Sequence, residues 1–312
     1  MKMKIDDERS EGGRTAKNPP YLQYCDSGDV RLAVYCQGDP SKPNIVLVHG
    51  YPDDSQVWDL LVNQLADQFY IIRYDVRGAG NSTTPANRSD YLLAYLKADL
   101  QAVTTKFCSR TRFHLVGHDW GSVQSWESVT CPTFREKILS YTSISGPCLD
   151  HVGHWFRRRW RESGGPRSVI QQIFQSWYIW LFKLPFLAPL LWRTVLGRHW
   201  LRIMRALESI NTQHVTLAQG VHRQRDGING IELYRANCLR YFRSPRERIS
   251  NRPVQLVIPT RDRFLNADLY SETAAWVSNI VIHRIDGGHW LPLSHPHILA
   301  TLIGDFVTKT EP

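Results

Sequence analysis

The feature that most constrains this chain is the segment 113–121, in which an apolar run ends in Gly-His-Asp-Trp-Gly. A segment of helical character follows at residues 122–130. Glycines at both ends of the polar stretch allow a backbone crowding that a Cβ would prevent. The pattern predicts the strand, sharp turn and helix of a nucleophile elbow, with Asp119 as a nucleophile that attacks carbon directly. A simpler interpretation is that Asp119 caps the helix.

The rest of the chain alternates between apolar runs and helical segments, as in a mostly parallel sheet with helices on both faces. Right-handed crossovers then give a doubly wound α/β fold with eight strands. Strands are expected at residues 21–25, 31–37, 44–49, 69–74, 113–118, 138–144, 254–258 and 280–285. Helices are expected at residues 55–66, 91–107, 122–130, 266–277 and 296–307.

The alternation stops at Gly146-Pro147 and resumes at Pro253. The intervening segment is helical in character, aromatic and basic, so we expect an inserted helical lid, or cap domain, at residues 149–251. The core domain then consists of residues 19–148 and 252–312. Residues 1–18 are polar and charged, without the apolar stretch of a secretory signal, and are expected to form a disordered leader.

Polar side chains at the carboxyl ends of parallel strands meet at one edge of a sheet. His289 follows the last strand in Gly-Gly-His-Trp, and a neutral histidine is the ordinary base for activating water against an ester on Asp119. Asp262 lies just past the strand at 254–258 and is the expected acid that orients His289. Asp150 is the second choice. Asp262 could instead cap a helix or pair with an arginine.

The oxyanion formed during ester hydrolysis needs two preset hydrogen-bond donors. The amide of Trp120, directly after the nucleophile, is expected to supply one. The amide of Tyr51, in His-Gly-Tyr-Pro at residues 49–52, is expected to supply the other. His49 and His118 are expected to form local hydrogen bonds that shape the two turns rather than to transfer protons.

Charge is distributed unevenly along the chain, whose formal net charge is +9. Residues 151–250 carry 17 Lys and Arg against 5 Asp and Glu, and six of the eleven tryptophans. A solvated arginine-rich face explains this most simply. Nothing beyond charge supports nucleic-acid binding, whereas peripheral membrane contact through the basic aromatic lid stays open. The apolar span 177–196 contains two prolines and two cations, which argues against a transmembrane helix.

The six cysteines are scattered, without a Cys-x-x-Cys pair or the spacing of metal ligands. Such sparse use of cysteine indicates free thiols in a reducing compartment, so a cytoplasmic location is expected.

Four motifs carry a resemblance to a known family: His-Gly-Tyr-Pro at 49–52, Asp-Val-Arg-Gly-Ala-Gly-Asn-Ser at 75–82, Gly-His-Asp-Trp-Gly at 117–121 and Gly-Gly-His-Trp at 287–290. With these motifs the chain resembles, over residues 21–306, the epoxide hydrolases of the α/β-hydrolase fold. The first three motifs are also similar to those of haloalkane dehalogenases, which share the aspartate nucleophile. The chain is similar, too, to the hydrolase half of some two-domain proteins that continue into a short-chain dehydrogenase.

The resemblance implies that two lid tyrosines bind and protonate the epoxide oxygen. Tyr178 and Tyr234 stand in sequence contexts that match the family, although tyrosines in an aromatic lid are more often core residues. The aromatic residues Trp177, Trp180 and Phe182 are expected to bind the substrate.

The sequence therefore predicts an epoxide hydrolase that uses water to convert a bulky apolar epoxide to a vicinal diol, with no metal or organic cofactor. The arginines leave room for a carboxylate-bearing lipid. A haloalkane dehalogenase is the first alternative, although Tyr51 occupies a position where that family often has Asn as a halide-binding donor. Trp177 and Trp180 keep this alternative open. A non-catalytic ligand-binding protein of the same fold is the second, and the chain is compatible with a monomer or a homodimer.

Overall fold

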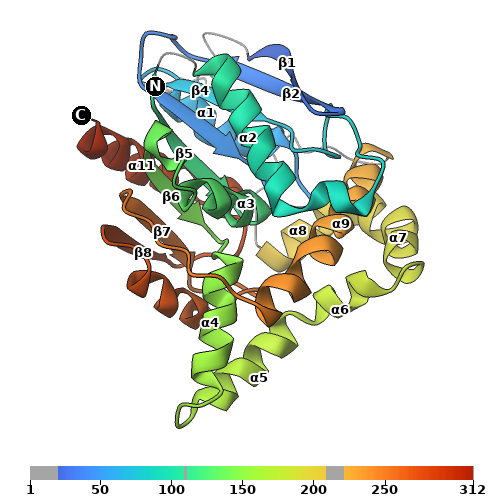
Figure 1. Ribbon diagram of the computed structural model, residues 1–312. Coiled ribbons are helices and arrows are strands. Elements are labelled where there is room, and N and C mark those ends of the chain that lie inside the picture. The colour runs from blue at the N-terminus through green and yellow to red at the C-terminus, as the bar shows by residue number, and fades with distance from the viewer. Residues whose placement is uncertain (1–19, 109–110, 209–220, 312) are drawn as a thin grey trace, which may run out of the picture.

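The computed structural model describes residues 20–108, 111–208 and 221–311, so the expected leader at 1–18 lies outside the described residues. Eight strands form one sheet in the order β1-β2-β4-β3-β5-β6-β7-β8 (Figure 1). Strands β1 and β2 pair antiparallel with each other, β2 pairs antiparallel with β4, and the remaining neighbours are parallel. The strands are β1 (Tyr21–Ser27), β2 (Val30–Gln37), β3 (Asn44–Val48), β4 (Tyr70–Tyr74), β5 (Phe113–His118), β6 (Ile138–Ile144), β7 (Val254–Pro259) and β8 (Ile280–Ile285). The predicted α/β fold with a mostly parallel eight-stranded sheet is confirmed.

Strand β3 illustrates why helices cover both faces of this sheet. Ile45 and Leu47 pack with helices α1 and α11, whereas Val46 and Val48 belong to the core on the side of α2 and α3. Successive residues of a strand point to opposite faces of the sheet, and helices cover both faces, so all four side chains are fully buried. The helices of the two layers are α1 (Asp59–Leu65), α2 (Leu93–Phe107), α3 (Trp120–Val129), α10 (Leu291–Ser294) and α11 (Pro296–Thr310). Short 3₁₀ turns complete the connections at η1 (Ser55–Trp58), η2 (Arg88–Tyr91), η3 (Arg135–Lys137) and η6 (Ala267–Ala275).

Between β6 and β7 the chain leaves the sheet and forms a group of helices that lies beside it in Figure 1. These are α4 (Leu149–Arg159), α5 (Gly165–Gln175), α6 (Trp177–Lys183), α7 (Leu187–Leu191), the π-helical turn η4 (Trp192–Leu196), α8 (Gly197–Glu208) and α9 (Val221–Arg243). The longest of them, α9, brings Tyr234 against Trp120 at the carboxyl end of β5. The inserted helices therefore lie over the sheet edge where parallel strands end. The domain boundaries at 149 and 251 stay a prediction.

Candidate active site

The turn after β5 has the tight geometry of an elbow. Asp119 has φ 50° and ψ −123°, a conformation that residues other than glycine rarely adopt. Its backbone N–H donates to the carbonyl of Ile144 at 3.0 Å, which ties the turn to the end of β6. A Cβ at Gly121 would collide with the carbonyl oxygen of Val48, and one at Gly146 would collide with the carbonyl of Asp119. Close backbone contacts thus explain the glycines and hold the carboxylate at the end of the strand.

His289 lies between two carboxylates. Its Nδ1 is 2.8 Å from Oδ2 of Asp262, and its Nε2 is 3.4 Å from Oδ1 of Asp119. The other oxygen of Asp262 accepts the backbone N–H groups of Phe264 and Leu265 at 2.7 and 3.1 Å. Asp262 therefore both turns the chain after β7 and fixes the imidazole. The structure brings together all three residues of the predicted triad.

The two carboxylates determine the charge of His289. Burial alone would lower the pKa of this imidazole, but Asp262 and Asp119 together raise it well above its ordinary value. The imidazolium is therefore the favoured form as long as Asp119 is ionised. Any reaction that neutralises Asp119 removes one source of this upward shift.

Asp150, the alternative acid, has other partners. Its oxygens accept the backbone N–H and the guanidinium of Arg246 at 2.8 Å each, and Nε of Arg248 at 3.1 Å. Both arginines also pair with Glu127 on α3. Asp150 thus belongs to an ion cluster at the start of α4, and Asp262 is the acid that contacts His289.

One of the two expected oxyanion donors contacts the carboxylate in this structure. The backbone N–H of Tyr51 donates to Oδ2 of Asp119 at 2.7 Å. A Cβ at Gly50 would collide with the same oxygen, so the loop requires glycine there. Trp120 is the first residue of α3, and the first amides of a helix have no partner within the helix. The role of the Trp120 amide stays a prediction.

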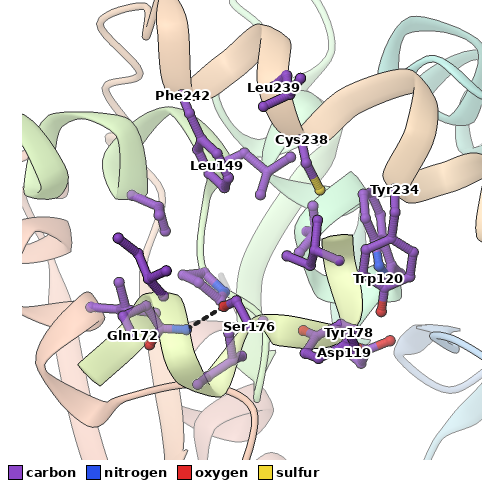
Figure 2. Close-up of a pocket in the computed structure, with 18 of the residues that line it drawn as sticks. Asp119, Trp120, Leu149, Gln172, Ser176, Tyr178, Tyr234, Cys238, Leu239 and Phe242 are labelled. Atoms are coloured by element: carbon purple, nitrogen blue, oxygen red, sulfur yellow. Dashed lines mark hydrogen bonds between the residues drawn. The ribbon is translucent and has the colours of Figure 1, made fainter. Parts of the chain in front are cut away.

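Tyr178 on α6 and Tyr234 on α9 line the same cavity as Asp119 and Trp120 (Figure 2). The two tyrosine rings lie 5.7 Å apart at an angle of 88°, and Tyr234 is 4.8 Å from the ring of Trp120. Burial, and then the negative charge of Asp119, raise the pKa of both hydroxyls well above the ordinary value. Both phenols therefore stay protonated and can donate hydrogen bonds next to the carboxylate.

The cavity has a volume of about 250 Å³ and is mostly apolar. Its walls come from α4, α5, α6 and α9 and include Leu149, Val152, Phe156, Ile179, Leu239 and Phe242. Gln172, which Figure 2 shows in the same wall, is occupied by hydrogen bonds to Ser176 and to the loop after β7. Cys238 is inert here, because burial raises the pKa of its thiol to about 12. The cavity suits an apolar molecule that presents one polar group to Asp119 and the tyrosines.

The three aromatic residues predicted to bind substrate lie in different places. Trp180 lines the cavity, although much of its side chain is exposed. Phe182 is buried behind the cavity, where its ring packs against those of Tyr51 and Tyr234. Trp177 does not line the cavity and is 62% exposed. Adjacent residues of a helix point about 100° apart, so α6 turns Tyr178 inward and its neighbour Trp177 outward.

A buried ion pair that the sequence analysis missed joins the inserted helices to the site. Arg223 on α9 is fully buried and donates to the carbonyl of Pro52 and to Oδ1 of Asp53, the latter at 3.4 Å. Asp53 in turn accepts the indole N–H of Trp290 at 2.7 Å. This chain of contacts connects α9, the loop of Tyr51 and the loop that carries His289. In an arginine-rich segment nothing in the sequence distinguishes Arg223 from its exposed neighbours.

Glu208, at the end of α8, is the second group that was missed. It is 7% exposed, and its Oε2 accepts the backbone N–H of Trp290 at 3.3 Å. Its Oε1 has no hydrogen-bond partner among the described residues. Burial raises the pKa of this carboxyl, while the charge of His289 acts in the opposite direction. A signal was available, because Glu208 ends a run of 45 residues without an acidic side chain.

His49 and His118 both form hydrogen bonds, as expected, but apart from a contact of His49 Nδ1 with the carbonyl of Gly50 these join their turns to other loops. Nε2 of His49 accepts the backbone N–H of Val76 at 2.9 Å, which links two of the loops around the site. Nε2 of His118 donates to the carbonyl of His289 at 3.0 Å. Burial lowers the pKa of His118 to about 4, so its ring is neutral and positions the histidine loop.

Comparison with known proteins gives a family match and several relatives. A model of the alpha/beta hydrolase fold matches residues 43–296. The probable oxidoreductase EphD of Mycobacterium tuberculosis is 36% identical over 295 residues, which cover 92% of this chain and 49% of that protein. Human epoxide hydrolase 4 is 23% identical over 302 residues, covering 93% of this chain and 78% of that protein.

Solved structures agree on the fold. The structure of Bacillus megaterium epoxide hydrolase with an inhibitor matches with a TM-score of 0.74 and 19% identity, covering 92% of this chain and all of that one. The epoxide hydrolase VrEH1 from Vigna radiata matches with a TM-score of 0.71 and 17% identity, covering 93% of this chain and 99% of that one. This chain spans about half the length of EphD, so the activity in that name describes a longer protein.

Proposed function

Since the chain belongs to the α/β-hydrolase fold family, we propose that it is an epoxide hydrolase that forms an ester on Asp119 and releases a vicinal diol. One observation carries the proposal: a carboxylate and two protonated phenols line the same apolar cavity. A phenol pair opposite a carboxylate suits a substrate whose leaving oxygen stays attached to the product. Relatives named epoxide hydrolases support the proposal.

In the first step, Oδ1 of Asp119 attacks an oxirane carbon and the carbon–oxygen bond of the ring breaks. The electron pair of that bond moves to the ring oxygen, which takes a proton from the phenol of Tyr178 or Tyr234. The resulting phenolate recovers a proton from the imidazolium of His289 through solvent. This step leaves a neutral ester on Asp119 and a neutral imidazole. An alkoxide is a poor leaving group, so the phenols contribute most where negative charge develops.

In the second step, His289 takes a proton from water and the hydroxide attacks the ester carbon of Asp119. The oxyanion forms on Oδ2, the oxygen that the amide of Tyr51 already contacts, and the amide of Trp120 is the second donor. When the intermediate collapses, the bond between the ester carbon and Oδ1 breaks. The released alkoxide takes the proton of the carboxylic acid so formed. The diol leaves, and the carboxylate and the imidazolium are restored.

The charge of His289 fits both steps. In the free enzyme two carboxylates raise the pKa of the imidazole, so it carries the proton that the first step consumes. Ester formation removes the charge of Asp119 and one of the two sources of the raised pKa. The same imidazole is then a better proton acceptor for the second step.

The substrate that fits best is bulky and apolar, because apolar side chains form most of the cavity wall. Lys183 is the one cation among the described residues that line the cavity, and it could pair with a carboxylate on the substrate.

A haloalkane dehalogenase is the alternative with the same nucleophile. It would need two N–H donors for the halide; Trp120 and Trp180 line the cavity, whereas the exposed Trp177 lies away from it. Two phenols beside the carboxylate have no role in that reaction. A non-catalytic ligand-binding protein would have no use for a histidine held between two carboxylates.

One incubation tests the proposal against both alternatives. The wild-type protein and the Asp119→Ala variant are each mixed with styrene oxide, a long-chain epoxide and 1-bromobutane. We expect diol from the wild type alone, with the long-chain epoxide preferred. Bromide release without diol would assign the site to a dehalogenase. No product from any of the three would favour the ligand-binding protein.

A further inference from the structure

The outer face of the lid carries large apolar side chains in solvent. We define this outer lid face by the exposed side chains Phe174, Trp177, Trp180, Phe186, Leu187 and Leu190. Phe186 is 85% exposed and Phe174 is 74% exposed. Single exposed apolar residues are ordinary on a protein surface, but a contiguous group of them marks an interaction site.

The spacing and the fold place these residues on one surface. Trp177 and Trp180 on α6 are three residues apart, as are Leu187 and Leu190 on α7, so each pair shares a side of its helix, and Phe174 stands near the end of α5, the helix before α6. Helices α5, α6 and α7 run one after another along the edge of the molecule farthest from the sheet (Figure 1). The apolar side chains therefore form one band on the outside of the lid.

The segment of chain that carries this band has charged side chains of one sign only. Residues 163–207 contain six Lys and Arg and no Asp or Glu. Arg167 on α5 and Arg193 on η4 are exposed, and Lys183 lies between them at the end of α6. Tryptophan side chains favour the boundary between lipid and water, and cations there are attracted to anionic headgroups.

We propose that the outer lid face docks the protein on the surface of a bilayer that contains anionic lipid. The aromatic side chains enter the headgroup region, and Arg167 and Arg193 contact lipid phosphates. This combination of a wide apolar face and flanking cations is that of an interfacial anchor.

A second copy of the chain fits the face less well. A twofold symmetric contact would set the same band against itself, with cations opposite cations and no acid between residues 163 and 207 to neutralise them. A spanning segment fits less well too. No single described helix is long and apolar enough to span a bilayer, and the pair that passes together, Trp177–Lys183 with Leu187–Glu208, is bent by 104°.

The band also borders the cavity. Ile173, Trp180 and Lys183 line the cavity and belong to α5 and α6, two of the three helices that carry the outer lid face. A docked protein would therefore hold its cavity close to the lipid. This last point rests on the proposed function, under which an apolar epoxide reaches Asp119 from the bilayer without crossing water.

Sedimentation with lipid vesicles tests the docking directly. We expect the wild type to bind phosphatidylcholine vesicles that contain phosphatidylglycerol, to bind pure phosphatidylcholine more weakly, and to dissociate as salt rises. The double variant Phe174→Ser/Phe186→Ser should bind about tenfold more weakly or worse, because both lost side chains are apolar anchors. Tyr21→Ser/Ile249→Ser is the matched control, since it removes two exposed apolar side chains elsewhere and should bind like the wild type.

Three outcomes would overturn the proposal. The first is a wild type that stays in the supernatant with anionic vesicles. The second is a Phe174→Ser/Phe186→Ser variant that binds as the wild type does. The third is a concentration-dependent dimer that only this variant loses, which would assign the face to a second copy. Styrene oxide turnover, measured without vesicles, separates the two proposals: it should be equal in all three proteins, and its absence throughout would count against the hydrolase alone.

Discussion

The backbone N–H of Tyr51 donates to one oxygen of Asp119, Oδ2, while His289 faces the other oxygen, Oδ1. The two oxygens of the carboxylate are thus different before any substrate arrives. Oδ2 is held where a carbonyl oxygen will develop negative charge, and Oδ1 is free to attack carbon. The distinction gives the proposed mechanism a direct isotopic consequence.

In a single turnover in H₂¹⁸O, the diol should carry no label. Water attacks the carboxyl carbon of Asp119, so its oxygen enters the carboxylate, while the new oxygen of the diol comes from Oδ1. Mass spectrometry of the diol and of the peptide containing Asp119 measures both. Label in the diol of the first turnover would mean that water attacks the epoxide directly and would exclude the ester.

Replacing the lid phenols should slow ester formation. Tyr178→Phe and Tyr234→Phe should each lower kcat/KM for styrene oxide about 10- to 100-fold, because each removes a hydrogen bond to a developing alkoxide. The double variant should lose considerably more. Tyr91→Phe is the matched control, since the hydroxyl of Tyr91 is buried without a partner among the described residues. Full activity in the double variant would reduce Tyr178 and Tyr234 to core residues.

The acid that orients His289 can be identified from the variants in which the ester on Asp119 accumulates. His289→Gln should stop at the alkyl-enzyme, seen in intact-protein mass spectrometry as one added substrate mass. Asp262→Asn should slow ester hydrolysis at least about 100-fold, since the imidazole loses the group that orients it.

Asp150→Asn is the control for that comparison. It should hydrolyse the ester normally but unfold at lower denaturant, because Arg246 and Arg248 lose a buried partner at a cost of roughly 1–3 kcal/mol, reduced by the exposure of Arg246. If the ester accumulated in Asp150→Asn while Asp262→Asn turned over normally, Asp150 would be the acid that orients His289 and Asp262 would not.

The pH dependence should differ between the two chemical steps. Asp262 and Asp119 raise the pKa of His289 in the free enzyme, so ester formation should be fastest below that pKa, where the imidazolium supplies its proton. Ester hydrolysis needs the neutral imidazole and should accelerate as pH rises through the lower pKa of the ester form. Rapid-quench kinetics resolves the two rates. NMR titration of His289 in Asp119→Asn should give a lower pKa than in the wild type. An unchanged pKa would contradict the proposal that loss of the Asp119 charge lowers the pKa of His289.

The same shift affects stability with a definite sign. The pKa of His289 is raised on folding, so its charged form stabilises the native state fully below the unfolded pKa of about 6.5. That contribution disappears as pH rises through the folded pKa. The free energy of unfolding of Asp119→Asn should therefore differ less between acidic and alkaline pH than that of the wild type.

Glu208 should destabilise the protein when it is ionised. Burial raises the pKa of its carboxyl above the unfolded value of about 4.3, so the native state binds the proton more tightly and stability falls as pH rises through that window. Glu208→Gln keeps an acceptor for the Trp290 amide and should be the more stable protein at pH 8, but not at pH 4. Urea unfolding at both values measures this. Glu208→Ala, which removes the acceptor, should be less stable than Glu208→Gln at both.

The core of the fold and two of the three proposed triad residues, Asp119 and His289, could be predicted from sequence because their signals are local. Strand β5 and its glycine-flanked turn identify Asp119 within a few residues, and the loop after β8 identifies His289 in the same way. The choice between Asp262 and Asp150 could not be made locally, since both follow a strand. It depends on the arginines near residue 247, which neutralise Asp150 from across the insertion.

The inserted helices were less predictable. Their aromatic residues give no clear single face, and so Trp177 was assigned to the cavity although it points to solvent. Glu208 and Arg223 acquire their roles only when α8 and α9 pack against the loops of the core. Such contacts join positions more than eighty residues apart, and no short pattern encodes them.

The buried contacts of Arg223 divide the lid into two mechanical parts. Lifting α9 would leave a guanidinium and the carboxylate of Asp53 without each other in a dry interior, at a cost of roughly 3–5 kcal/mol. We therefore expect helix α9 to stay with the loops of Tyr51 and His289, and Tyr234 to keep its place when a ligand enters the cavity. Helix α5 is held to the loop after β7 by the hydrogen bonds of the Gln172 amide, and α6 is held to α9 through Arg235. No ion pair with Asp53 holds these two helices, so we expect them to move at a lower cost than α9 when a ligand enters the cavity.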